Sequence, residues 1–161
     1  MPKYISNVVF FEVFREEKEA IYRFLPKNIN VLFYENTIQE EKCDIPDGAI
    51  ISIRTQSEVP LSWESKISAI LTRSTGHDHL YSFMNNSSVK IPCGFLPIYC
   101  ARSVAEHALL IWTSLIKKLP KQIENFKTFN RNGITGSELK NKNLLVIGVG
   151  NIGIEIIKIA S

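Results

Sequence analysis

One segment near the end of the chain restricts the possible folds more than any other. The run Leu144–Ile147 is apolar throughout and is followed by Gly148, Gly150 and Gly153, which have the spacing GxGxxG. Residues 154–160 then continue with apolar positions at helical spacing. A continuous apolar run is typical of a parallel strand buried on both faces. Strand, glycine-rich turn and helix in this order predict the start of a dinucleotide-binding Rossmann unit.

Each position of this motif has a physical task. Gly148 permits the tight turn, Gly150 lets the main chain approach a pyrophosphate, and Gly153 allows the helix to pack closely on the strand. The main-chain N–H groups near Asn151 and Ile152 would point at the anion, with the helix dipole behind them. A glycine-rich turn without a ligand is the alternative. The strand before it and the helix after it favour the binding site.

The composition is that of a folded chain and argues against a nucleic-acid partner. The 161 residues are 45% hydrophobic and 22% charged, which is close to globular averages. The formal net charge of +3 is spread along the sequence, with no patch that could neutralise several phosphates. We therefore expect no nucleic-acid partner.

The cysteines and the apolar runs indicate a cytoplasmic protein. Cys43, Cys93 and Cys100 are odd in number and form no CxxC pair, so they predict neither a disulfide framework nor a zinc site. No apolar run approaches the roughly 20 residues that span a bilayer, and the N-terminus lacks the pattern of a signal peptide. We expect no membrane contact and no metal.

The first part of the chain alternates strand and helix patterns. An amphipathic helix is predicted at 15–25, a short helix around 62–65, and a polar loop at 35–48. Strands are predicted at 8–14, 29–34, 49–53 and 67–72. This alternation favours an α/β fold with a parallel sheet covered on both faces.

The clearest helix pattern follows Pro92, Gly94 and Pro97. Ser103 and Glu106 have the spacing of a capping box, which predicts a helix that begins at Ser103 and ends at Pro120. Its apolar face is wider than a single contact requires. We therefore expect this helix to lie between domains or between subunits, and we expect a homodimer.

Three blocks of sequence resemble one enzyme family. They read "ILTRSTGHDHL", "LPIYCARSVAEHALLIWTSLIKKL" and "GSELKNKNLLVIGVGNIGIEIIKIA", and together they cover about two thirds of the chain. In this order they resemble the D-isomer-specific 2-hydroxyacid dehydrogenases. The resemblance implies a flavodoxin-like substrate domain at 1–100, followed at 101–161 by the start of a Rossmann domain that is truncated after the GxGxxG.

The resemblance also implies a set of binding residues. Thr75 and Gly76 match the family's loop whose amide N–H groups hold the substrate carboxylate, and Tyr99 matches a tyrosine that touches substrate in D-lactate dehydrogenases. Ser103 falls near the nicotinamide, although a helix cap explains it equally well. The implied cofactor is NAD, with NADP left open, and the implied substrate is a small 2-hydroxy or 2-oxo acid.

Two departures from the family pattern concern the substrate and the hinge. In the pattern GxDxxD, Gly76 and Asp78 are kept but Tyr81 stands at the second acidic position. Ala101-Arg102 replaces a frequent Pro-Asn. The identity of the substrate acid and the geometry of the hinge are therefore open.

The family's catalytic arginine, acidic residue and histidine would follow the fingerprint, so we assign no catalytic residue in this chain. His77 and His79 flank Asp78, but two positions on one face without a third ligand do not predict a metal site. His107 is expected to pack or to contact another domain. A triad of Ser103, His107 and Asp78 is improbable because nothing supplies an oxyanion hole.

These observations predict a fragment of an NAD-dependent oxidoreductase that transfers a hydride between NAD(H) and a D-2-hydroxy or 2-oxo acid. Alone, this fragment would be inactive and would bind NAD weakly. The alternative is a non-enzymatic small-molecule sensor or a dimerising, corepressor-like module. A reading frame that continues past Ser161 favours the enzyme, whereas a stop there with a stable dimer favours the module.

Overall fold

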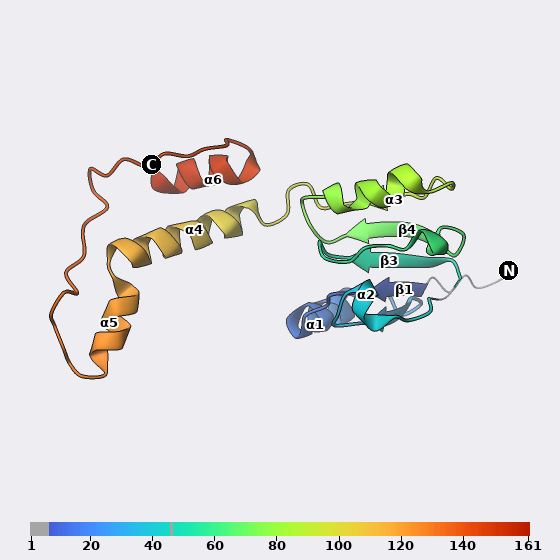
Figure 1. Ribbon diagram of the computed structural model, residues 1–161, viewed down its shortest axis with the longest axis horizontal. Helices are drawn as coiled ribbons and strands as arrows, with labels where there is room; N and C mark the ends of the chain where they lie inside the picture. The colour runs from blue at the N-terminus through green and yellow to red at the C-terminus, as the bar shows by residue number, and fades with distance from the viewer. Residues whose placement is uncertain (1–6, 46) are drawn as a thin grey trace. The chain divides into compact units, whose positions relative to one another are not determined.

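The computed structural model describes residues 7–45 and 47–161. The chain divides into two compact units, one that extends to Tyr99 and one from Cys100 to Ser161 (Figure 1). The first unit contains a parallel sheet with its helices, and the second is helical in its described elements. We call them the sheet unit and the helical unit.

The sheet unit contains five parallel strands in the order β2-β1-β3-β4-β5. Their bounds are β1 Asn7–Phe10, β2 Asn30–Phe33, β3 Ala49–Ile53, β4 Ile67–Thr72 and β5 Cys93–Gly94. This strand order is that of flavodoxin-like folds, in which the direction of winding reverses between β1 and β3. The predicted α/β fold with a parallel sheet is therefore confirmed.

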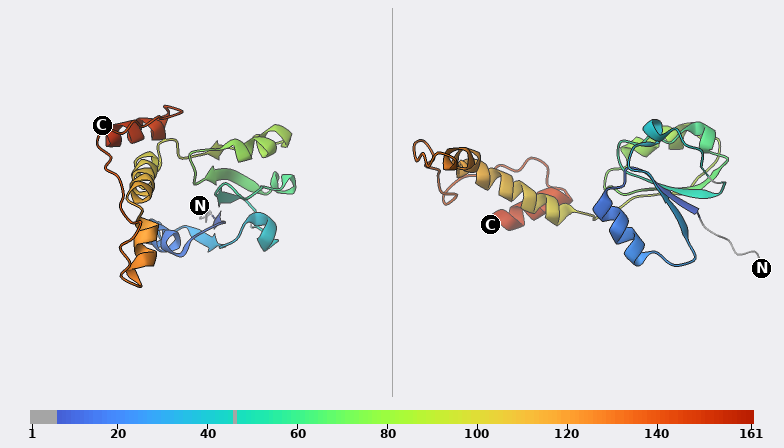
Figure 2. Two further views of the ribbon diagram at one scale, coloured as in Figure 1. Left: turned by 60° about the vertical axis from the view of Figure 1, so that its left-hand side comes forward. Right: turned by 90° about the horizontal axis from the view of Figure 1, so that it is seen from below.

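Helices cover both faces of this sheet. Helix α1 (Arg15–Phe24) lies on one side, whereas α2 (Ile38–Glu41) and α3 (Tyr81–Asn86) lie on the other (Figure 2, right). Opposite faces follow from right-handed crossovers, because β1 to β2 and β2 to β3 move in opposite directions across the sheet. Two short 3₁₀ helices, η1 (Leu61–Trp63) and η2 (Asp78–Leu80), complete the unit.

The core of the sheet unit centres on β1, β3 and β4. Four of the five residues of β3 are buried, which agrees with its predicted central place. The ring of Phe11 stacks on Tyr34 at 5.0 Å between centroids and contacts Trp63 at 6.2 Å. The largest apolar side chains that are fully shielded from solvent are Val9, Phe11, Ile51, Ile53 and Ile70.

Several boundaries in the sheet unit differ from the sequence prediction. The strand predicted at 8–14 ends at Phe10, because Glu12 takes a positive φ of 56° and turns the chain. The loop predicted at 35–48 contains α2, whose capping box joins Thr37 and Glu40. No helix or strand was predicted between residues 73 and 99, where the structure has η2, α3 and β5.

The helical unit is built from α4 (Ala101–Ile116), α5 (Leu119–Phe126) and α6 (Asn151–Ala160). Helix α6 lies alongside α4 in all three ribbon views (Figures 1 and 2). The guanidinium of Arg102 on α4 reaches Glu155 on α6 at 3.5 Å. None of the helices in the described residues has the length and apolarity needed to cross a bilayer.

The prediction of a helix capped by Ser103 and ended by Pro120 was wrong at both ends. Helix α4 begins at Ala101, after Cys100 with its positive φ of 64°, so Ser103 lies inside the first turn. Glu106 accepts a hydrogen bond from Arg102 at 2.7 Å instead of capping the helix. Pro120 lies in the first turn of α5, where a missing N–H costs nothing.

The run Leu144–Ile147 is not a strand in this structure, which corrects the sequence prediction. It pairs with no other strand of the described residues. Leu145 and Ile147 are 83% and 90% exposed. Apolar sequence alone cannot make a strand, because the main-chain groups of a strand must bond to a neighbour. The helix predicted after the glycines is present as α6.

Candidate functional site

In the glycine-rich turn before α6, two of the three glycines stand where a side chain would be strained or would clash. Gly148 has a φ of +92°, a conformation that L side chains rarely adopt. A Cβ at Gly153 would overlap the main-chain oxygen of Gly148 and would lie 3.6 Å from Cγ1 of Val146. These two glycines are therefore required by the fold of the turn itself.

Gly150 is different, because nothing inside the chain requires a glycine there. Its φ of −83° suits any residue, and a Cβ would meet no atom within 4 Å. It is the N-cap of α6, and no side chain caps the helix at this point. The main-chain N–H groups of Ile152 and Gly153 lie in the first turn, where an α-helix provides no acceptor. With the helix dipole, this end of α6 can bind an anion.

Ser103, the other predicted cofactor residue, lies in the first turn of α4 with an exposed side chain. The structure places Ser103 in the unit that also holds the glycine-rich turn.

The second group of predicted residues lies in the loop that follows β4 in the sheet unit. The hydroxyl of Thr75 donates to the carbonyl oxygen of Tyr99 at 3.1 Å, so the structure brings these two residues together. The amide of Leu96 donates to the carbonyl of Ser74 at 3.0 Å. Residues 94–99 therefore run along this loop, and we call Ser74–Gly76 the β4 loop.

A chain of hydroxyl groups fixes the β4 loop from the inside. Ser74 Oγ donates to the carbonyl oxygen of Gly76 at 2.6 Å and also lies 2.7 Å from Oγ1 of the buried Thr72. Thr72 must then donate to Ser74, so His79 Nε2, at 3.0 Å from Thr72 Oγ1, carries the proton of that ring. Burial lowers the pKa of His79, which keeps the ring neutral near pH 7.

The amide groups of the β4 loop are available for a ligand. Within the described part of the chain, the N–H groups of Thr75 and Gly76 donate to no acceptor. A Cβ at Gly76 would meet no atom within 4 Å, and its φ is ordinary. Adjacent amide N–H groups on a turn form a concave site for an anion such as a carboxylate. The side chain of Tyr99 is 49% exposed beside this loop.

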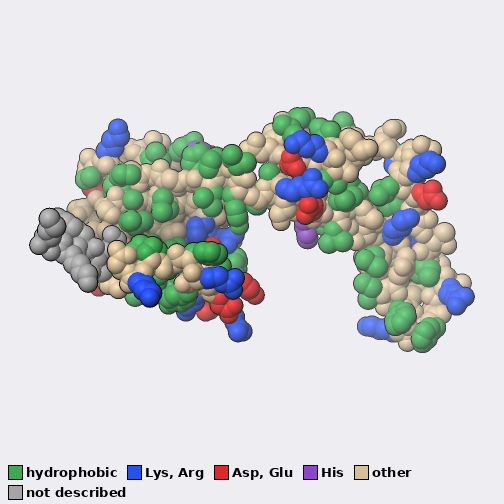
Figure 3. Space-filling model, turned by 180° about the vertical axis from the view of Figure 1, so that it is seen from behind, with side chains coloured by type: hydrophobic (Ala, Val, Ile, Leu, Met, Phe, Trp, Pro, Cys, Tyr) green, Lys and Arg blue, Asp and Glu red, His purple; other side chains and the backbone are tan. Residues whose placement is uncertain are grey.

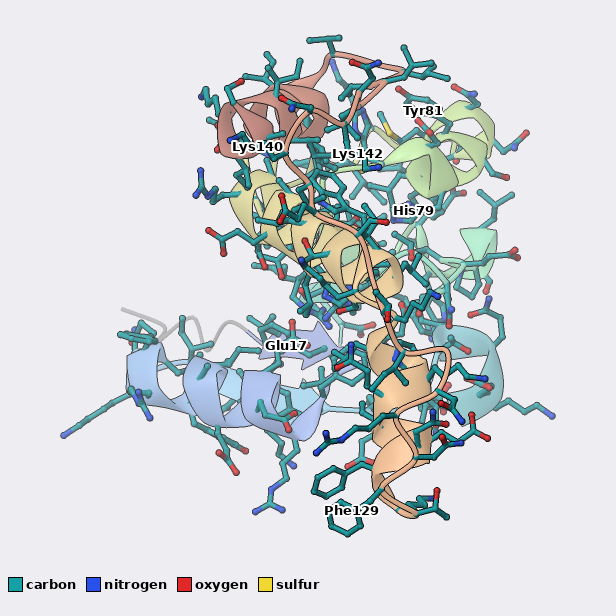
Figure 4. All side chains as sticks on the ribbon, turned by 90° about the vertical axis from the view of Figure 1, so that its left-hand side faces the viewer. Glu17, His79, Tyr81, Phe129, Lys140 and Lys142 are labelled. Atoms are coloured by element: carbon teal, nitrogen blue, oxygen red, sulfur yellow. The ribbon has the colours of Figure 1, made fainter. Side chains whose placement is uncertain are left out.

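Sequence analysis missed Arg73, which anchors the start of the β4 loop. Its guanidinium bonds Glu17 Oε1 at 2.7 Å, Ser52 Oγ at 3.0 Å and the carbonyl of Phe11 at 2.7 Å. The side chain is only 13% exposed. Figure 4 labels Glu17 on α1, at the carboxyl ends of the strands.

Glu12 holds a second loop at this edge of the sheet. Its carboxylate accepts hydrogen bonds from the amides of Arg54, Gln56 and Ser57 at 3.0 to 3.1 Å. Beside it lies a cavity of about 310 Å³, lined by residues that follow β1, β2 and β3. Ligands of parallel α/β folds bind at such carboxyl edges, where the winding reverses.

Two of the three histidines lie within hydrogen-bonding distance of a hydroxyl group. His79 bonds Thr72, whereas His77 lies 3.3 Å from the hydroxyl of Tyr81 through Nε2. The described residues contain no cluster of three or more His, Cys, Asp or Glu side chains that could hold a metal ion. His107 lies on α4 with an exposed side chain. Asp78 belongs to the sheet unit, whereas Ser103 and His107 belong to the helical unit.

The surfaces of the two units carry mixed charges. On the face in Figure 3, basic and acidic side chains are interspersed rather than gathered by sign. Hydrophobic side chains also reach the surface of the helical unit. The most exposed of them in this unit are Leu115, Phe126, Phe129, Leu145 and Ile147.

Comparison with known proteins identifies the fold. No protein-family model matches the chain, and no curated protein matches it in sequence. Solved structures do match. A D-lactate dehydrogenase from Aquifex aeolicus, complexed with NAD and lactic acid, is 26% identical, has a TM-score of 0.75, and is matched over 96% of this chain and 48% of its own.

Two further structures match over similar lengths. The pyruvate reductase of Chlamydomonas reinhardtii is 18% identical with a TM-score of 0.80, over 97% of this chain and 48% of its own. The D-lactate dehydrogenase of Escherichia coli is 18% identical with a TM-score of 0.77, over 96% and 51%. The chain thus spans about half the length of the structures it matches. The resemblance to D-2-hydroxyacid dehydrogenases is confirmed in the fold.

Proposed function

We propose that this chain, which has the fold of about half of a D-2-hydroxyacid dehydrogenase, is the front part of an oxidoreductase that transfers a hydride between NAD(H) and a D-2-hydroxy or 2-oxo acid. Residues 1–100 are the substrate domain in this proposal, and residues 101–161 begin the NAD-binding domain. The cytoplasm is the proposed compartment, because three cysteines without a CxxC pair suit a reducing environment.

A single observation supports the proposal: two turns each combine main-chain N–H groups with a glycine that the fold itself does not need. Gly76 and Gly150 both lie in open space with ordinary φ values. Because folding does not need a glycine at either position, close approach of a ligand is the simplest physical reason for both. A hydroxy acid and a dinucleotide each carry the anion that such a site binds.

The β4 loop would hold the substrate. In this proposal the amides of Thr75 and Gly76 bind its carboxylate, and Tyr99 contacts it from the adjoining segment. The hydroxyl chain through Ser74 and Thr72 keeps these amides in place without using them. A carboxylate held by fixed donors is oriented as well as bound, which hydride transfer to the neighbouring carbon requires.

The turn before α6 would hold the cofactor, and its residues fit a dinucleotide. Gly148, Gly150 and Gly153 would bring the main chain to the pyrophosphate, and the amides of Asn151 and Ile152 would donate to it. Ser103 would lie on the nicotinamide side. When bound, the nicotinamide supplies or accepts the hydride. NAD is proposed, and NADP is the alternative.

We assign no catalytic acid, base or carboxylate-clamping arginine to this chain. Arg73 is committed to Glu17 and Ser52, and His79 to Thr72, so neither is free for the substrate. The chain alone should therefore be inactive and should bind NAD more weakly than micromolar. A homodimer would cover the exposed apolar side chains of the helical unit. The matched structures are dehydrogenases and a reductase, so the sensor or corepressor-like alternative gains no support from them.

The experiment begins with the gene. If the reading frame continues past Ser161, we expect an acidic residue about 20 positions after the glycines for NAD, or a basic or small residue for NADP. An arginine, an acidic residue and a histidine should follow. The extended protein should oxidise NADH with pyruvate, glyoxylate or a longer 2-oxo acid. An extended protein that carries all three groups and is inert toward every acid would refute the proposal.

A further inference from the structure

The side chains around the β4 loop indicate which acid it would select. His77, directly after Gly76, stacks on Phe95 with 4.1 Å between ring centroids and 21° between planes. Tyr81 meets the same histidine edge to face at 5.5 Å. Three aromatic rings, from the residue after the β4 loop, from α3 and from the segment after β5, therefore form one cluster.

The cluster is fixed to the loop by main-chain bonds. Phe95 precedes Leu96, whose amide bonds the carbonyl of Ser74 at 3.0 Å. Gly94, on the other side of Phe95, belongs to β5 and pairs with Leu71 of β4. The main chain of Phe95 is therefore held beside the β4 loop on both sides.

The same rings remain open to solvent. Phe95 is 42% exposed and Tyr81 is 46% exposed, although aromatic rings of this size usually bury more of their surface. An exposed aromatic cluster next to unpaired amides is suited to a ligand with an anionic end and an apolar or aromatic end.

The charges near the loop disfavour a second carboxylate. Arg73 is the basic residue nearest to the loop in sequence, and its guanidinium is occupied by Glu17, Ser52 and the carbonyl of Phe11. His79 is neutral near pH 7 because burial lowers its pKa. Asp78 places an exposed carboxylate two residues after Gly76. A dicarboxylic acid would meet repulsion from Asp78, and neither Arg73 nor His79 would offer its second carboxylate a free positive charge.

We propose that the substrate is a 2-hydroxy or 2-oxo acid with an aromatic or bulky apolar side chain, and that Phe95 and His77 determine this specificity. The inference rests on the proposed function, because it assumes that the β4 loop holds the carboxylate. Tyr81, which stands where the resembled pattern has an acid, belongs to the same aromatic cluster.

The test is an amide NMR titration of the 161-residue chain with D-3-phenyllactate, D-lactate and D-malate. All three should shift the Thr75 and Gly76 signals. Phenyllactate should bind about three- to tenfold more tightly than lactate, the range that one ring contact provides, and malate more weakly than lactate. Phe95→Leu should reduce phenyllactate binding to the level of lactate and leave lactate unchanged. Phe24→Leu, at a phenylalanine 80% exposed on α1, is the control and should change neither.

The outcomes separate the two proposals. Equal affinities for the three acids, or tightest binding of malate, with the Thr75 and Gly76 shifts present, would overturn the aromatic specificity and leave the carboxylate site standing. Loss of lactate binding in Phe95→Leu would also overturn it, because the ring would then support the loop rather than select the side chain. No shift at Thr75 or Gly76 with any acid would overturn the carboxylate site itself.

Discussion

The main-chain oxygen of Gly148 occupies the place where a Cβ of residue 153 would have to lie. The two glycines are five residues apart, one in the turn and one in the first turn of α6. Their contact sets how closely the helix follows the turn. Gly150 lies between them and has no such contact. The fold therefore requires a glycine at 153, whereas at 150 only the approach of a ligand would require one.

Gly153→Ala should therefore destabilise the helical unit, whereas Gly150→Ala should not. The new methyl group at 153 must displace main chain, and overpacking of this kind costs about 1–3 kcal/mol. At 150 the cost should stay within about 1 kcal/mol, the scale of a changed N-cap. Hydrogen exchange of the α6 amides measures both. Equal protection in the two variants would contradict the steric interpretation.

The Arg73–Glu17 pair should contribute strongly to stability. Arg73→Met leaves the carbonyl of Phe11 without its donor and leaves Arg54, at 3.5 Å, as the only cation beside the partly buried Glu17 among the described residues. The unfolding free energy should therefore fall by about 2–4 kcal/mol. Arg15→Met is the matched control, because Arg15 pairs with Glu19 at 3.2 Å but is 89% exposed. It should change stability by less than about 1 kcal/mol in urea titrations. Similar losses in both would show that burial of Arg73 adds nothing.

His79 should make stability fall as the solution becomes acidic. Burial lowers its pKa in the folded state below the ordinary histidine value of about 6.5, so the unfolded chain binds the proton more readily. The stabilising contribution is complete above pH 6.5 and is lost as pH falls from there toward the lower folded-state pKa. His79→Gln keeps a donor to Thr72 and does not titrate, so its stability should depend less on pH between 7.5 and about 5. Parallel pH profiles would contradict this assignment.

The exposed apolar run before the glycines should cause self-association. Leu145 and Ile147 are 83% and 90% exposed. Exposed apolar side chains of this kind favour association, because a second copy of the chain can bury them. Light scattering should show a dimer or larger, and Leu145→Glu with Ile147→Glu should reduce the mass. Leu61→Glu, at a leucine 45% exposed in the sheet unit, should not. A monodisperse monomer of the unchanged chain would refute the expectation.

Hydrophobic periodicity predicted the sheet well because its central strands are apolar and bounded by polar turns. The bounds of β3 and β4 agree with the predicted ranges. The prediction of a strand at 144–147 was wrong, because a strand needs a neighbouring strand to pair with, and an apolar sequence pattern does not show whether one is present. Short elements such as η2 and β5 carry no period long enough to detect.

In the candidate sites too, local features could be predicted from sequence, and contacts between distant residues could not. Gly148 and Gly153 could be predicted because their roles depend on local main-chain geometry. The roles of Arg73 and Glu12 could not, since their partners lie 21 to 62 residues away along the chain. The contact of His77 with Phe95 also depends on the pairing of β5 with β4.

The most direct test of the dehydrogenase proposal is whether NAD contacts the turn before α6. In an amide NMR titration of the 161-residue chain, NAD should shift Gly150, Asn151 and Ile152, with an affinity weaker than micromolar. Gly150→Val should remove these shifts while the other α6 signals keep their positions, because a side chain there blocks the ligand and not the fold. Signals at 150–152 that stay unmoved at millimolar NAD, or that move equally in Gly150→Val, would contradict the proposed cofactor site.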